Sequence, residues 1–164
     1  MSNSLLKGLT ISALLVSAPV LAEEPLTVSV KRLSLDTAQR IAKASVDACR
    51  EKGIQIGVTV VDRDGVVQAQ LRDTIAAPIT IPISYKKAYT AANFNSDTSG
   101  LKDRADGPLG QLDFLLLLGG GVTVSSGGAL LGGVGVSGAP ASETDEECAR
   151  AGVEAVKDDL EMAM

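Results

Sequence analysis

Apolar residues recur every three to four positions in two stretches of the chain, and this spacing predicts two amphipathic helices. The first covers residues 35–49, with Ser34 as a typical N-cap and Gly53 placed to end the helix. The second is expected over residues 80–94, where Pro82 is tolerable only in the first turn. Each helix therefore offers one apolar face to a core.

A third helix is predicted near the C-terminus. It is expected to open with Thr144-Asp145-Glu146-Glu147, which has the form of a capping box and places acids at the positive end of the helix dipole. Its apolar face is predicted to consist of Ala149, Val153, Val156 and Leu160.

Runs of β-branched and alternating apolar residues between the helices predict strands. Residues 54–61 and 66–71 flank the turn signal Asp62-Arg63-Asp64-Gly65, and together they form the clearest β-hairpin in the sequence. The polar stretch 95–108 is expected to hold short helical turns at most, because glycine and proline interrupt it.

Further strands are expected after this polar stretch. Residues 112–118 have the pattern of a buried strand, which the three glycines at 119–121 end. Extended structure resumes at 122–124, and another strand is predicted over 129–136. The order of elements favours an α/β (α+β) fold with one antiparallel sheet flanked by helices.

The first 22 residues have the pattern of a cleavable export signal. Lys7 is the only charged residue before Glu23, the chain from Gly8 to Val20 is apolar or small, and Ala22 completes a small-residue cleavage pattern. The alternative is a retained membrane anchor, although the apolar run is short for that role. We expect cleavage after Ala22, leaving residues 23–164 as a single domain in the periplasm or secreted.

Charge and composition exclude several classes of partner. The net charge of −5 becomes −6 once Lys7 is removed, and the basic residues form no stripe, so neither nucleic acid nor a membrane surface is expected to bind the mature chain. The chain has no histidine, which excludes Ser-His-Asp and Cys-His nucleophile systems and every imidazole-ligated metal site.

The two cysteines, Cys49 and Cys148, are expected to form a disulfide, because exported thiols persist as pairs more often than singly. Two separate buried thiols are the alternative.

Two features suggest a ligand site. Residues 119–138 contain nine glycines, which permit either close approach of a ligand or second chain to the backbone, or only tight turns and bulges. The GxGxxG match at 133–138 lacks the βαβ context of a dinucleotide site and is interpreted as a coincidence. On the second helix, Lys86 and Lys87 share helical faces with Tyr89 and Thr90, an arrangement suited to an anion such as a carboxylate.

Taken together, these segments resemble the GlcG/HbpS family of haem-binding or haem-degrading domains. The resemblance spans roughly residues 33–160, with its blocks in family order: residues 60–65, 71–73, 87–92, 119–122, 131–138 and 145–149. It implies a profilin-like sheet with flanking helices, assembly into homo-oligomers, and a tetrapyrrole as the ligand class. The sequence departs from the family at Ile79, where many relatives carry a histidine.

The resemblance and the residues together lead to an expected haem site where the second helix faces the glycine-rich strands. Tyr85 or Tyr89 would be the iron ligand if a side chain ligates haem in this histidine-free chain. We expect Arg72→Ala and Lys87→Ala to weaken haem binding without unfolding the protein. The residues expected to bind the ligand are Arg72, Lys86, Lys87, Tyr89, Thr90, Gly119, Gly120 and Gly121.

Two other functions stay open at this stage. One is an enzyme, or an accessory to one, that acts on a tetrapyrrole or on a small organic acid linked to glycolate use. The other is a structural oligomer without a ligand, whose glycines serve subunit packing.

Overall fold

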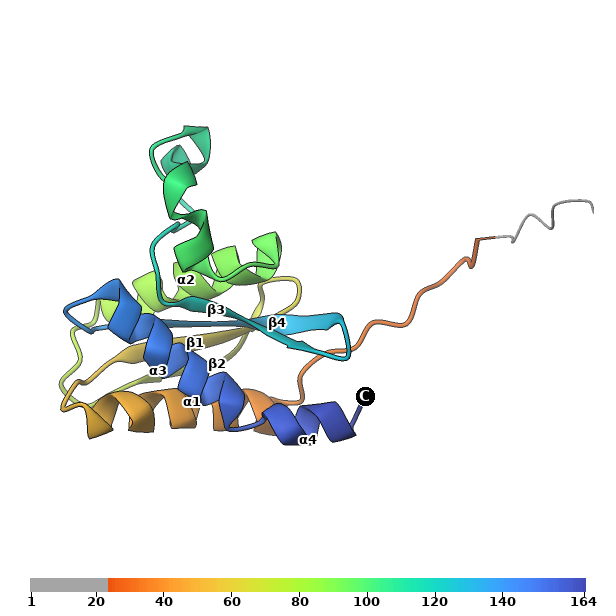
Figure 1. Cartoon of the computed structure of the whole chain (residues 1–164), viewed down its shortest axis with the longest axis horizontal. Helices are drawn as coiled ribbons and strands as arrows, with labels where there is room; N and C mark the ends of the chain where they lie inside the picture. The colour runs from red at the N-terminus through yellow and green to blue at the C-terminus, as the bar shows by residue number, and fades with distance from the viewer. Residues whose placement is uncertain (1–23) are drawn as a thin grey trace, which may run out of the picture.

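A computed structural model describes residues 24–164, so the expected signal peptide and its cleavage site lie outside the described residues. Figure 1 shows the elements in chain order. They are α1 (Leu35–Glu51), β1 (Gly57–Asp62), β2 (Val67–Arg72), α2 (Thr80–Phe94), the 3₁₀ helices η1 (Thr98–Arg104) and η2 (Pro108–Gln111), β3 (Gly121–Ser126), β4 (Ala129–Ser137), α3 (Ser142–Glu154) and α4 (Lys157–Met162).

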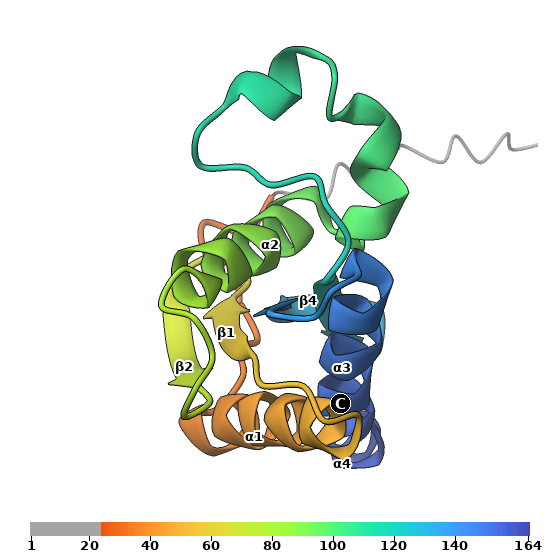
Figure 2. The same cartoon turned by 90° about the vertical axis from the view of Figure 1, so that its left-hand side faces the viewer.

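The four strands form one antiparallel sheet in the order β2-β1-β4-β3. Helices α1 and α3 lie against one face of the sheet, and α2 lies against the other (Figure 2). This arrangement confirms the expected antiparallel sheet flanked by helices. Within residues 24–164, no helix is long and apolar enough to cross a membrane.

The main core fills the space between the sheet and the α1–α3 layer. Ser34 caps α1 by accepting the backbone N–H of Thr37 at 3.2 Å, as the sequence predicted. Every third or fourth residue of α1 then faces inward against valines of the two central strands, β1 and β4. These core residues include Ala38, Ile41, Ala42, Val46, Val58, Val60, Val134 and Val136.

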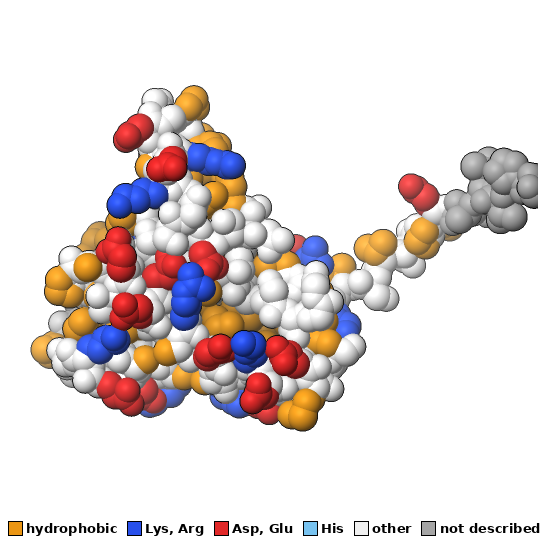
Figure 3. All heavy atoms as spheres, viewed as in Figure 1, with side chains coloured by type: hydrophobic (Ala, Val, Ile, Leu, Met, Phe, Trp, Pro, Cys, Tyr) orange, Lys and Arg blue, Asp and Glu red, His pale blue; other side chains and the backbone are white. Residues whose placement is uncertain are grey.

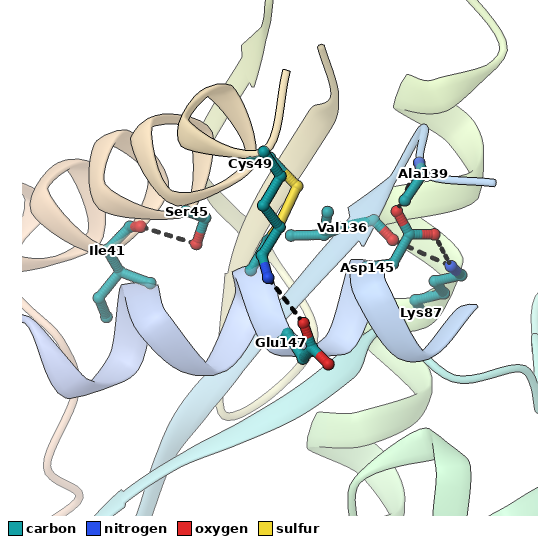
Figure 4. Close-up of a disulfide and its surroundings, with 10 residues drawn as sticks. Ile41, Ser45, Cys49, Lys87, Val136, Ala139, Asp145 and Glu147 are labelled. Carbon is teal, nitrogen blue, oxygen red and sulfur yellow. Dashed lines mark hydrogen bonds and ion pairs between the residues drawn. A yellow bond between two sulfur atoms is a disulfide. The ribbon is translucent and has the colours of Figure 1, made fainter. Parts of the chain in front are cut away.

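The predicted disulfide joins Cys49 at the end of α1 to Cys148 on α3, with a Cα–Cα distance of 5.5 Å (Figure 4). Both residues are fully buried in the core. The bridge therefore fastens together the two helices that cover one face of the sheet.

The glycines of β4 serve the packing of α2, an outcome that neither interpretation of the glycine-rich stretch anticipated. A Cβ atom added to Gly135 would lie 2.0 Å from the carbonyl oxygen of Ser84 in α2. Only a strand without side chains at such points lets the helix backbone approach this closely. The surface expected to meet a ligand is thus occupied by the chain's own helix.

The strand predicted over residues 112–118 is wrong: this segment is irregular. Leu115 and Leu117 are buried, but they pack with Leu101 of η1 rather than within the sheet. The backbone N–H of Leu116 donates to Oγ1 of Thr90 at 2.9 Å, so a side chain of α2 takes the place of a strand partner.

The predicted start of the last helix is also wrong. Helix α3 begins at Ser142, two residues before Thr144, and no side chain caps it. Asp145 turns inward instead of remaining near solvent at the helix end. The chain then breaks after Glu154, because Val156 leaves helical geometry and is buried in the core, and α4 follows.

Candidate functional site

Lys87, expected to meet a ligand, is buried within the fold. Its side chain is only 2% exposed, and its Nζ lies 2.7 Å from Oδ2 of Asp145 and donates to the carbonyl oxygen of Val136 at 3.0 Å (Figure 4). Asp145 also accepts the backbone N–H of Ala139 at 2.9 Å. Burial raises the pKa of Asp145, while the ammonium group of Lys87 acts against this rise. The structure therefore gives Lys87 a structural contact, and we no longer expect Lys87→Ala to leave the fold intact.

The neighbouring glycines complete this buried arrangement. Gly120 has a φ of +114°, and a Cβ atom placed there would lie 2.6 Å from Nζ of Lys87. The N–H of Gly121 donates to Oγ1 of Thr98 at 2.9 Å, and Gly119 is buried beside them. Together with the contact of Thr90 described above, these bonds show that Lys87, Thr90, Gly120 and Gly121 contact other parts of the protein. Gly119 lines a separate cavity of about 290 Å³.

The two tyrosines lie along α2 and are half-buried. Their ring centroids are 5.9 Å apart, and the ring of Tyr89 also meets Phe114 edge-on at 6.2 Å. Tyr85 packs beside Val61, and Tyr89 lies over Gly65 in the hairpin turn. Both rings thus occupy the side of α2 that faces the β1–β2 hairpin.

A cavity of about 510 Å³ lies at the N-terminal end of α2. Its walls come from the loop after α1, the β2–α2 loop with the first residue of α2, and the end of β4, segments that are far apart in the sequence. The lining residues are Gly53, Gln55, Ile75, Ala76, Ala77, Ile79, Thr80, Ser137, Gly138 and Ala139. Ile75 is 78% exposed and Ile79 is 60% exposed, so apolar side chains at this cavity face solvent.

A cation lies beside this cavity. Arg72 is exposed at the end of β2, and its guanidinium donates to the carbonyl oxygen of Ala76 in the cavity wall. The loop itself is held by Arg50, which donates from Nε and Nη2 to the two carboxylate oxygens of Asp73, each at 2.7 Å. These bonds lower the pKa of Asp73 to about 2. The backbone carbonyl oxygen of Asp73 accepts the N–H of Ala76 at 3.1 Å, so the residue held by Arg50 also contacts the cavity wall.

Lys86, another predicted cation, is half-buried on α2. Ile79, the N-cap residue, already has helical dihedrals, and Lys86 follows it by seven residues, or about two turns. Residues at this spacing share one face of a helix. The structure therefore places Arg72 beside the cavity, and it places Lys87, Thr90, Gly120 and Gly121 in the contacts described above.

A second cavity, of about 430 Å³, lies under the irregular segment that follows η2. Its walls include Leu115–Leu118 and the side chains of Lys102 and Asp106. Its lining includes the acid Asp106 as well as the cation Lys102, and a negative charge there disfavours the binding of an anion.

Most of the chain matches a known protein family. The family described as "Haem degrading protein HbpS-like" matches residues 33–154. The chain belongs to this HbpS-like family. No curated protein matches it significantly.

Solved structures of the HbpS-like fold agree with this membership. A double mutant of Streptomyces reticuli HbpS is 36% identical, with a TM-score of 0.76 over 85% of this chain and 97% of that one. The PduOC:haem complex is 26% identical, with a TM-score of 0.71 over 76% of this chain and 94% of that one. Klebsiella pneumoniae protein ORFY, at 24% identity and a TM-score of 0.76 over 82% of this chain and 97% of that one, shows the shared fold.

Family membership confirms the resemblance seen in the sequence and directs attention to Ile79. Ile79, where the resemblance implies a histidine in relatives, lies in the wall of the larger cavity. Other lining residues, such as Gln55 and Ile75, were not identified from the sequence as ligand contacts. They meet only because the β2–α2 loop and the end of β4 lie side by side in the fold.

Proposed function

We propose that this HbpS-like chain binds haem or a related tetrapyrrole in the cavity at the N-terminal end of α2. The observation that carries the proposal is the combination of apolar residues around Ile79 with the cation Arg72 at one place. A tetrapyrrole needs apolar contact for its ring and cations for its carboxylates. The haem complex of PduOC, a protein of the same fold, supports this ligand class.

The residues present fit the ring and the carboxylates of haem but supply no imidazole for its iron. Among the side chains that line the cavity, only Gln55, Thr80 and Ser137 are polar. The hydroxyl of Thr80 already donates to the carbonyl oxygen of Ala77 at 2.7 Å. Haem would supply a redox-active iron when bound, whereas the residues of this chain hold the macrocycle and its carboxylates.

If the protein recognises the ring and the carboxylates of haem, the iron should contribute little to the binding affinity. Haemin and metal-free protoporphyrin IX are expected to bind with similar dissociation constants in absorbance titrations. Arg72→Ala should weaken the binding of both ligands about tenfold, since it removes one charge-assisted contact.

Lys102→Ala is the matched control, because it removes a cation at the second cavity and should change neither dissociation constant. The reverse result, with Lys102→Ala weakening binding and Arg72→Ala not, would place the ligand at the second cavity. No binding of either porphyrin would refute the proposed function.

A histidine placed at the family position should give the chain the iron ligand that it lacks. Ile79→His is expected to tighten haemin binding by about tenfold or more and to shift its Soret band, because imidazole ligates haem iron. The affinity for metal-free protoporphyrin IX should stay within about twofold of the parent. Leu71→His, outside the cavity lining, serves as the control, and an equal effect of both variants on haemin would contradict this placement.

We also propose that the protein works outside the cytoplasm, in the periplasm or secreted. The signal pattern of residues 1–22 supports export, and so does the Cys49–Cys148 disulfide, because disulfides persist in oxidising compartments.

A further inference from the structure

The segment that precedes α1 has the pattern of a β-strand but lies outside the sheet. We call residues 24–31 the N-terminal arm. Leu26, Val28 and Val30 alternate with Thr27, Ser29 and Lys31. Leu26 is fully exposed and Val28 is 79% exposed. Figure 3 shows hydrophobic side chains along this arm, standing clear of the body of the protein. The arm also precedes the family match, which begins at residue 33.

The backbone of the arm is unpaired, whereas the two residues after it contact the β1–β2 hairpin. We call these residues, Arg32 and Leu33, the root of the arm. Within the described part of the chain, residues 24–31 make no backbone–backbone hydrogen bond. Directly after the arm, Arg32 forms ion pairs with Asp62 and Asp64 at the turn between β1 and β2. The carbonyl oxygen of Leu33 accepts a hydrogen bond from Gln68 at 2.9 Å. The root therefore lies beside the start of β2, and the arm extends away from the body (Figure 1).

The two edges of the sheet differ in how they are covered. At the β3 edge, side chains take the backbone donors: Thr98 accepts the N–H of Gly121 and Asp97 accepts that of Thr123, each at 2.9 Å. The described residues place no strand or comparable side-chain cover along β2. Val67 and Leu71 are 45% and 38% exposed there. An open edge with exposed apolar side chains is a template for another strand.

We propose that the N-terminal arm of one copy adds as a fifth strand along β2 of a second copy. Eight extended residues span about 26 Å, enough to follow the six residues of β2. The backbone hydrogen bonds would supply affinity, and the alternating side chains would contact the exposed apolar residues of the edge. The root lies beside the start of β2, so the arm leaves each copy next to the edge that would bind the partner's arm. A two-fold exchange requires this, because both copies use the same surface.

Cross-linking between differently tagged copies tests this pairing, using chains that begin at Glu23. One copy carries Val28→Cys in the middle of the arm, and the other carries Gln70→Cys in the middle of β2. We expect a short bismaleimide to join them into a covalent heterodimer. The control partner carries Ser125→Cys, an exposed position on the β3 edge, and should not be joined.

Truncation provides the second measurement. A chain that begins at Lys31 keeps Arg32 and the folded domain, and it is expected to show a lower mass by light scattering than the chain from Glu23. The heterodimer together with this loss of mass supports the exchange. An unchanged mass after truncation would overturn the proposal. So would cross-linking within one chain: a chain that carries both Val28→Cys and Gln70→Cys would then be joined internally at high dilution, while the mixed copies would not be joined.

Discussion

Replacing Lys87 by Ala is expected to lower the free energy of unfolding by about 3–5 kcal/mol, because it leaves a buried carboxylate without its counter-charge. Asp145 is 4% exposed, and its only charged partner among the described residues is Lys87. The variant also loses the hydrogen bond to the carbonyl oxygen of Val136. Denaturant unfolding followed by circular dichroism measures the change.

The adjacent residue provides a control for this prediction. Lys86→Ala removes a half-buried lysine that makes no ion pair with a described residue, so its effect on stability should stay within about 0.5 kcal/mol. The double variant Lys87→Met/Asp145→Leu removes both charges and should recover much of the loss. A Lys87→Ala protein as stable as the parent would contradict the structural assignment of this pair.

Removal of the disulfide is the second large effect that we expect. The double variant Cys49→Ala/Cys148→Ala should lower the free energy of unfolding by about 2–5 kcal/mol. The two cysteines are 99 residues apart in the sequence, so the bridge restricts much of the unfolded chain. It also joins α1 to α3 over the core, so the folded state loses a direct link between these helices.

Reduction of the parent protein separates the effect of the bond from that of the substitutions. A reductant should lower the stability of the parent to near that of the double variant, and it should leave the variant unchanged. If the reduced parent unfolds at the same denaturant concentration as the oxidised one, the bridge does not stabilise the fold. Thiol titration under unfolding conditions confirms that reduction is complete.

In this HbpS-like protein, the charged residue that stabilises the fold differs from the one proposed to bind the ligand. Lys87, first considered as a ligand contact, belongs to the buried framework that joins α2, β4 and α3. Arg72 remains at the surface beside the cavity at the N-terminal end of α2. Because the two groups have different roles, Arg72→Ala should alter ligand affinity and Lys87→Ala should alter stability.

Elements with a local signal were predicted well from the sequence. Ser34 and the helical spacing after it located α1, and the second helix was predicted over the residues that form α2. The hairpin of β1 and β2 followed from alternation around a strong turn signal. The cysteine pair followed from the compartment that a signal peptide implies. Each of these inferences depends on spacing or composition that a short segment carries by itself.

Features decided by distant partners could not be predicted in this way. The leucines at 115 and 117 are buried as their pattern indicated, but their partners are in η1, and apolar spacing does not say what covers a residue. Lys87 and Asp145 are 58 residues apart, and only the fold, which brings α2 and the start of α3 together beside Val136 at the end of β4, buries both. The candidate cavity likewise exists only where three separate segments meet. By itself, the sequence determined most of the helical and extended segments and which of their faces are apolar, because these depend on local backbone periodicity. The tertiary structure alone decided which charges are buried and where a ligand has space, because burial and cavity shape depend on contacts between segments far apart in the chain.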